Sequence, residues 1–110
     1  MASTLVPEAA RECADACAEC VQACEACAYN CCIPGGMADH ARLCLDCAAV
    51  CSLAMTLVSR GSKWAGEVCR LAAELCDMCA LQCGASDMQD CQVCAEACRR
   101  CADACRAMIP

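Results

Sequence analysis

The sequence predicts an all-α fold, an antiparallel up-down-up-down bundle of four helices with a cysteine-lined core. Cysteines recur every three or four residues, as in "CADACAECVQACEACAYNCC" at 13–32, which is the spacing of one helix face. Ala, Glu, Leu and Arg, which favour helices, surround them. Three short breaks divide the chain into four segments. We expect a single domain over residues 1–110, which is too short for two separate cores.

The breaks set the order of the predicted helices. They are "IPGG" at 33–36, "SRGSK" at 59–63 and "GASD" at 84–87. Pro7 stands near the first turn of the first segment, where its missing N–H costs little. Ser86 followed by Gln89 predicts a capping box that opens the last segment. Because the connections are short, neighbouring helices run antiparallel, each about 30 to 40 Å long at 1.5 Å per residue.

The cysteines occupy one face of each predicted helix. Their steps of three and four follow the a and d positions of a heptad, the seam that faces a bundle core. His40 stands in the same register one step before Cys44, whereas Cys32 falls outside the seam and has no assigned role. We predict that the seam cysteines are metal ligands: Cys13, Cys17, Cys20, Cys24, Cys27 and Cys31 in the first segment, Cys44, Cys47 and Cys51 in the second, Cys69, Cys76, Cys79 and Cys83 in the third, and Cys91, Cys94, Cys98, Cys101 and Cys105 in the fourth.

Charge and composition exclude several classes of partner. The net charge of -6, without a cluster of Lys and Arg, argues against nucleic acid. The opening "MASTLVPEAARE" lacks the basic and apolar regions of a secretion signal, and no segment approaches the roughly 18 uncharged apolar residues of a membrane span. We therefore expect a cytoplasmic protein with reduced thiols and no membrane partner.

An interior of thiols calls for a chemical explanation, because Leu, Ile and Val bury more apolar area per site. Disulfide stapling fits poorly, since helix axes 8 to 10 Å apart leave many facing Cα atoms beyond the roughly 7 Å reach of a bridge. A cysteine nucleophile needs one thiolate beside a base, so we expect no enzymatic activity. Zinc and iron–sulfur sites take separate sets of four ligands. Soft thiolates in a continuous file favour Cu(I).

The spacing and the charge both suit Cu(I). Seven cysteine pairs have C-x3-C spacing, which brings two thiolates together on one helix face. Buried thiolates without a counter-charge are prohibitive, so the metal-free core must hold neutral thiols, and each arriving Cu(I) displaces one proton. We expect multiple Cu(I) ions, on the order of eighteen, one for each inward cysteine.

The two ends of the predicted bundle differ. Met37, His40 and Met88 gather at one end, and we predict that they bind or gate copper there, although a lone His or Met also serves as an ordinary core residue. The other end is a predicted apolar plug of Leu5, Val6, Leu57, Val58, Trp64, Met108 and Ile109, where Ala54, Val58, Ala65 and Ala72 replace cysteine in the seam.

Two further apolar stripes run along the second and third segments, outside the seam. They indicate either an oligomer packed through these helices or wide contact inside one bundle. The stripes consist of Leu43, Val50, Leu53 and Leu57, and of Val68, Leu71, Leu75 and Met78.

From Pro7 to Met108 the chain resembles the bacterial copper storage protein family, by its inward cysteines in repeated C-x3-C and C-x2-C steps. The resemblance implies a homotetramer of bundles that sequesters Cu(I). It is closest to the cytosolic members, which lack a twin-arginine signal; these carry several histidines near the mouth, whereas this chain has only His40. A copper chaperone is a candidate partner that the sequence does not identify. A metallothionein-like buffer for zinc or mixed soft metals is the alternative, and a metal-free thiol bundle is a third.

Overall fold

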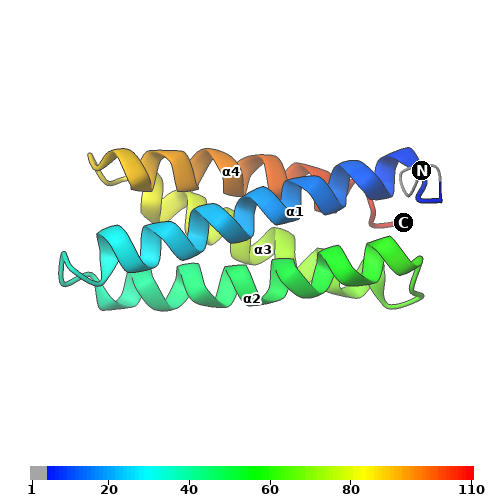
Figure 1. Ribbon diagram of the computed structural model, residues 1–110, viewed down its shortest axis with the longest axis horizontal. Helices are drawn as coiled ribbons and strands as arrows, with labels where there is room; N and C mark the ends of the chain where they lie inside the picture. The colour runs from blue at the N-terminus through cyan, green and yellow to red at the C-terminus, as the bar shows by residue number, and fades with distance from the viewer. Residues whose placement is uncertain (1–4) are drawn as a thin grey trace.

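Four helices lie side by side along one axis in the computed structural model, which describes residues 5–110 (Figure 1). Helix α1 (Glu8–Cys27) continues into a short π-helix, η2 (Ala28–Cys32), and is followed by α2 (Ala38–Arg60), α3 (Ala65–Gly84) and α4 (Gln89–Arg106). Consecutive helices run in opposite directions, and the bundle measures 42 × 26 × 17 Å. The described residues include no strand, so the predicted all-α bundle is confirmed.

Backbone hydrogen bonds and conformation define the start of α1 and the end of α2. The carbonyl of Pro7 accepts a hydrogen bond from the Arg11 N–H at 2.9 Å, which opens α1. Gly61 closes α2 in the left-handed region, at φ +65°, which a glycine adopts without steric cost. The Ser62 N–H then bonds to the Leu57 carbonyl at 3.0 Å, as in a Schellman motif.

The predicted capping box at Ser86 is wrong. Helix α4 begins at Gln89 after Met88, and no side chain caps its first turn. The Ser86 hydroxyl instead accepts a hydrogen bond from the Met88 N–H at 3.2 Å, two residues on. This local turn uses the hydroxyl before the helix begins, which is the competing role of serine outside helices.

The π-helix η2 changes the register at the end of the first helix. The Ile33 N–H bonds to the Ala28 carbonyl, five residues back, at 2.9 Å. This wider turn holds one more residue than an α-helical turn. It turns Cys32 into the interior, where its side chain is fully buried, so the expectation that Cys32 lies outside the inward set is wrong.

The core consists of cysteine and alanine. All nineteen cysteines are buried as free thiols, which confirms the predicted inward seam. Alanines fill the remaining buried positions together with Val58, and no polar or charged residue is buried among residues 5–110. Larger apolar side chains lie around this narrow core and are only partly buried.

The apolar plug at the N- and C-terminal end of the bundle is confirmed in part. Ala54, Val58, Ala65 and Ala72 are buried in the seam, and Val6, Leu57, Met108 and Ile109 pack against the core. Leu5 and Trp64 are mostly exposed, at 85% and 59%, so their predicted place in the plug is wrong. Both precede the first turn of a helix, and the Trp64 ring faces the Lys63 ammonium at 5.3 Å instead.

Helix α2 is more apolar than we predicted from the sequence. Over the described ranges it is the one helix long and apolar enough to cross a membrane, so the statement that no segment approaches such a span is wrong. The cause lies in its two faces. Cys44, Cys47 and Cys51 face the core, while leucines and Val50 form an outer stripe. A helix that packs one face into a bundle core can be this apolar without being a membrane span.

Candidate metal centre

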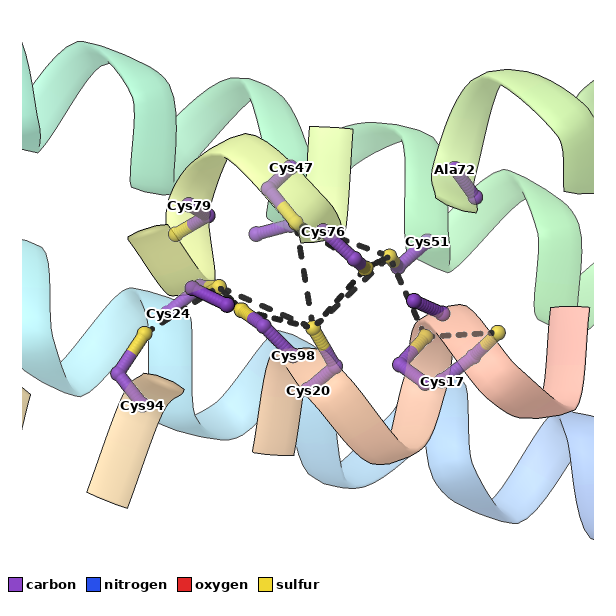
Figure 2. Close-up of a cluster of buried hydrophobic side chains, with 14 of the residues drawn as sticks. Cys17, Cys20, Cys24, Cys47, Cys51, Ala72, Cys76, Cys79, Cys94 and Cys98 are labelled. Carbon is purple, nitrogen blue, oxygen red and sulfur yellow. Dashed lines mark hydrogen bonds between the residues drawn. The ribbon is translucent and has the colours of Figure 1, made fainter. Parts of the chain in front are cut away.

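A continuous file of sulfur atoms runs through the middle of the bundle. All four helices contribute, because each places its three- and four-residue cysteine steps on the inner face. Neighbouring Sγ atoms lie between 3.2 Å, for Cys31 and Cys91, and 3.9 Å, for Cys13 and Cys105. Figure 2 shows the central part, where sulfurs from different helices point toward one another. An ion placed between such sulfurs has several thiolates within reach.

Cys20 lies at the densest part of the file. Two groups of four sulfurs, each within 4.8 Å of one another, share this residue. Cys20 Sγ is 3.7 to 3.9 Å from the sulfurs of Cys24, Cys47, Cys51, Cys76 and Cys98. Its thiolate can therefore bridge ions in adjacent sites.

Contacts between helices are as short as those within one helix. The C-x3-C pair Cys47 and Cys51 has an Sγ–Sγ distance of 3.9 Å, whereas Cys76 on α3 is 3.6 Å from Cys47 and 3.5 Å from Cys51. Thus the pairs predicted from the spacing are parts of larger sets that include facing helices. In Figure 2 these three sulfurs converge from α2 and α3.

A cluster of four thiols lies where the file meets the 33–37 turn. Cys27 is 3.7 Å from Cys32 and 3.6 Å from Cys91, and Cys31 is 3.2 Å from Cys91. Met88 Sδ lies 3.3 Å from Cys31 Sγ, so this predicted residue joins the thiols directly. The heptad pattern left Cys32 without a role. The available signal was the pair of adjacent cysteines, Cys31 and Cys32, at the end of the helical run, because π-turns, which change the register, are frequent at functional sites.

Met37 and His40 lie on the other side of the same end, between α2 and α3. They line a hollow of ≈ 560 Å³ together with Leu81, Gln82, Ala85 and Ser86. His40 stands one turn before Cys44, whose sulfur is 3.6 Å from Cys79 and 3.7 Å from Cys83. Soft donors therefore flank the file on two sides at this end, which we call the mouth.

At the opposite end the file stops at Cys13, Cys17, Cys69 and Cys105. Cys105 Sγ is 3.7 Å from Cys17 Sγ, and the positions beyond them in the seam are alanines and Val58. A hollow of ≈ 600 Å³ opens past Val58 and Met108 and carries the basic side chains Lys63 and Arg70. No cysteine lines it, so this end offers no continuation of the thiol file.

The electrostatics of the core favour an exchange of metal for protons. Burial raises the pKa of the Cys32 thiol from 9.0 to about 12, and burial likewise raises the pKa of Cys27 and Cys69. These three thiols are therefore neutral in the metal-free protein. A Zn²⁺ ion with four thiolates would leave two uncompensated negative charges, and no cation is buried among the described residues to balance them. One Cu(I) per thiolate leaves the core neutral.

Comparison with known proteins gives one family and several solved structures. Residues 6–110 match the family model described as "Copper storage protein". The Cu(I)-bound copper storage protein BsCsp3 is 34% identical, with a TM-score of 0.87 over 94% of this chain and 100% of that chain. The apo form of copper storage protein 3 from Bacillus subtilis is 36% identical, with a TM-score of 0.85 over 91% of this chain and 98% of that chain.

A third structure is a cytosolic copper storage protein from Streptomyces lividans, loaded with five coppers. It is 33% identical, with a TM-score of 0.85 over 93% of this chain and 92% of that chain. The comparison with curated protein sequences gives no significant match. The match to the family and to these structures thus covers nearly all of the chain.

Proposed function

The chain belongs to the copper storage protein family, and from that premise we propose that its nineteen buried cysteines are the ligands of the stored metal. The protein stores copper by binding many Cu(I) ions through thiolates inside its four-helix bundle. The observation that supports the ligand assignment is the file of buried free thiols, with neighbouring sulfurs 3.2 to 3.9 Å apart and overlapping groups of four within 4.8 Å, in a core without a buried cation among the described residues.

The ligand set that we propose is the eighteen seam cysteines together with Cys32 and Met88. Cys32 belongs with them because it is buried within one four-thiol group, and Met88 because its sulfur lies 3.3 Å from Cys31. We assign Met37 and His40 to the admission of copper at the mouth, since the hollow that they line contains no cysteine. The capacity that follows is on the order of nineteen Cu(I), one per thiol.

Anaerobic titration of the fully reduced protein with Cu(I), against a chromophoric Cu(I) chelator, tests this function. We expect saturation near one copper per cysteine, with about one proton released for each ion bound. Saturation with only a handful of coppers would contradict the proposal.

A metallothionein-like zinc buffer is the second candidate, because several groups of four buried cysteines have sulfurs within 4.8 Å of one another. A parallel titration with Zn²⁺ separates the two. A zinc buffer would saturate near one ion per four thiols, roughly five in total, and would hold zinc against copper. We expect Cu(I) to displace any bound zinc, since soft thiolates prefer it.

The storage role involves no catalytic turnover in our proposal. The whole of residues 1–110 acts as one storage domain in the cytoplasm, as the cytosolic relative from Streptomyces lividans supports. Copper then reaches the mouth from a donor such as a copper chaperone. Transfer from a Cu(I)-loaded donor that outpaces transfer from a small chelator of equal affinity would support a protein partner.

We also propose that the bundle assembles as a homotetramer through the outer stripes of α2 and α3. Leu53, Leu71 and Met78 are 48%, 48% and 55% exposed, so the single bundle leaves these apolar side chains uncovered. Analytical ultracentrifugation gives the mass in solution. A Leu53→Glu, Leu71→Glu double variant should shift the protein to smaller species, with its helical signal retained; an unchanged mass would place any interface elsewhere.

A further inference from the structure

Two buried polar atoms at the mouth have no hydrogen-bond partner in the part of the chain that the structure describes. They are Nδ1 of His40 and Oε1 of Gln82. Both side chains line the hollow of ≈ 560 Å³ between α2 and α3 that also holds Met37. An unpaired buried polar atom is costly, and native structures keep few of them. Two such atoms in one hollow therefore need a common explanation.

The two atoms are chemically complementary. The Gln82 oxygen can only accept a hydrogen bond, and a neutral imidazole carries a proton on one ring nitrogen and a lone pair on the other. The two residues lie on facing helices at the same end of the bundle. Cys44, one turn after His40 on α2, has its sulfur 3.7 Å from that of Cys83, the residue after Gln82 on α3.

Neighbouring groups that could orient the imidazole are engaged elsewhere. The Asp39 carboxylate, next to His40 in the chain, accepts a hydrogen bond from the Arg42 guanidinium at 2.9 Å. The Ser86 hydroxyl, also in the hollow, accepts one from the Met88 N–H. Gln82 Oε1 is the buried acceptor in the hollow that has no partner among the described residues.

We propose that Gln82 is the positioning residue of His40: its Oε1 accepts a hydrogen bond from the Nδ1–H, which leaves Nε2 with the free lone pair that receives Cu(I) at the mouth. A metal-binding histidine commonly has its other ring nitrogen fixed in this way by an oxygen. Both side chains line the same hollow, and the bond requires a change of side-chain rotamer within it. The inference rests on the proposed copper function, because it concerns the ion's first contact with the α2–α3 side of the file.

The tautomer of His40 gives a direct test that needs no copper. His40 is the sole histidine, so a protein labelled with ¹⁵N-histidine shows a single imidazole in its NMR spectrum. In the reduced, metal-free protein, at a pH where the ring is neutral, we expect the Nδ1–H form to predominate. A predominant Nε2–H form would overturn the proposal, because it would mean that Nδ1 accepts a hydrogen bond, for instance from Ser86 or from the amide nitrogen of Gln82.

Two substitutions at Gln82 sharpen the test. Gln82→Leu removes the acceptor, so the Nδ1–H form should fall from the majority to a minority. Gln82→Glu keeps an acceptor oxygen and should keep the Nδ1–H form. Gln22→Leu is the matched control, since Gln22 is exposed on α1 and does not line this hollow. An unchanged tautomer in Gln82→Leu, or a loss of the Nδ1–H form in Gln82→Glu, would each contradict the assignment.

The kinetics of loading link the tautomer to function. In stopped-flow transfer from a Cu(I) chelator, Gln82→Leu should slow the first phase several-fold and leave the final number of coppers unchanged. Unaltered rates in Gln82→Leu would overturn the role of Gln82 in loading. Failure of the storage function is a separate result, seen as low copper capacity in the unsubstituted protein, while the tautomer is read in the apo protein in either case.

Discussion

Cys27 and Cys32, five residues apart in the chain, bring their sulfur atoms to 3.7 Å of one another. In an α-helix, residues five apart point about 140° away from each other. The π-helix η2 reduces this divergence, because its hydrogen bond from Ile33 to Ala28 spans five residues and its turn is wider. The mouth of the file thereby gains a thiol that a regular helix would have turned outward.

Replacement of Cys32 should therefore lower the copper capacity. We expect Cys32→Ala to bind about one Cu(I) less than the unsubstituted protein, because one proton-exchanging thiol is lost. Anaerobic titration measures the difference. Asn30→Ala, an exposed position in the same π-helix, is the control and should keep the full count. An unchanged capacity in Cys32→Ala would show that this thiol holds no metal.

The position of a cysteine along the file should determine how much copper its loss removes. Cys20 belongs to two four-sulfur groups, so Cys20→Ala should remove about two Cu(I), since its thiolate bridges adjacent sites. Cys69 lies beside Cys13 and Cys105 at the end of the file opposite the mouth, which we call the blind end, and Cys69→Ala should remove at most about one Cu(I). Equal losses in the two variants would contradict the bridging role of Cys20.

The stability of the metal-free protein should fall at alkaline pH. Burial raises the pKa of Cys32 from 9.0 to about 12, so above pH 9 the unfolded chain has released a proton that the folded chain still binds. Each such thiol then lowers the free energy of unfolding by roughly 1.4 kcal/mol per pH unit, up to its folded pKa. Below pH 9 these thiols contribute no pH dependence.

Urea unfolding of the reduced protein, followed by circular dichroism at pH 7 and pH 10, measures this effect. The copper-loaded protein is the control, because its sulfurs carry no proton to lose and its stability should change much less. A metal-free protein equally stable at both pH values would show that its thiols are not held neutral by burial.

A thiol added between Cys69 and Cys76 on α3 should increase the capacity of the file. Ala72 is fully buried in the seam, and Figure 2 shows it near the end of the central cluster. We expect Ala72→Cys to bind about one additional Cu(I), because the new sulfur faces the same interior. Ala72→Ser is the control, because a serine side chain has nearly the shape of cysteine but no sulfur. It should bind no more Cu(I) than the unsubstituted protein. An equal capacity in both variants would show that a sulfur at this position binds no additional copper.

The heptad pattern was sufficient for the fold and for nearly all of the thiol file, because a seam of identical residues at steps of three and four has only one face to bury. Cys32 could not be placed in this way, since the pattern assumes α-helical turns throughout and one π-turn changes the register locally. The sets that join facing helices, such as Cys47 with Cys76, also lie beyond the pattern, because they depend on how the helices are offset along the bundle axis.

The ends of the helices were predicted less well than their faces. The Ser86 capping box failed because a serine before a helix can equally close a turn of its own, as the bond from the Met88 N–H shows. The predicted burial of Trp64 was wrong because the apolar character of a residue does not determine where its side chain points at the start of a helix. Gln82 carried no signal in the sequence, since its importance comes from an unpaired atom in a hollow shared with His40.

The blind end beyond Cys13 and Cys105 has a consequence for the order of discharge. If copper enters and leaves the file of thiols only through the mouth, the ions bound last are released first. The ions beside Met88 and Cys31 then exchange rapidly, whereas the ions beside Cys105 exchange slowly. A pulse of isotopically labelled copper given to a nearly full protein would accordingly be released ahead of the older metal.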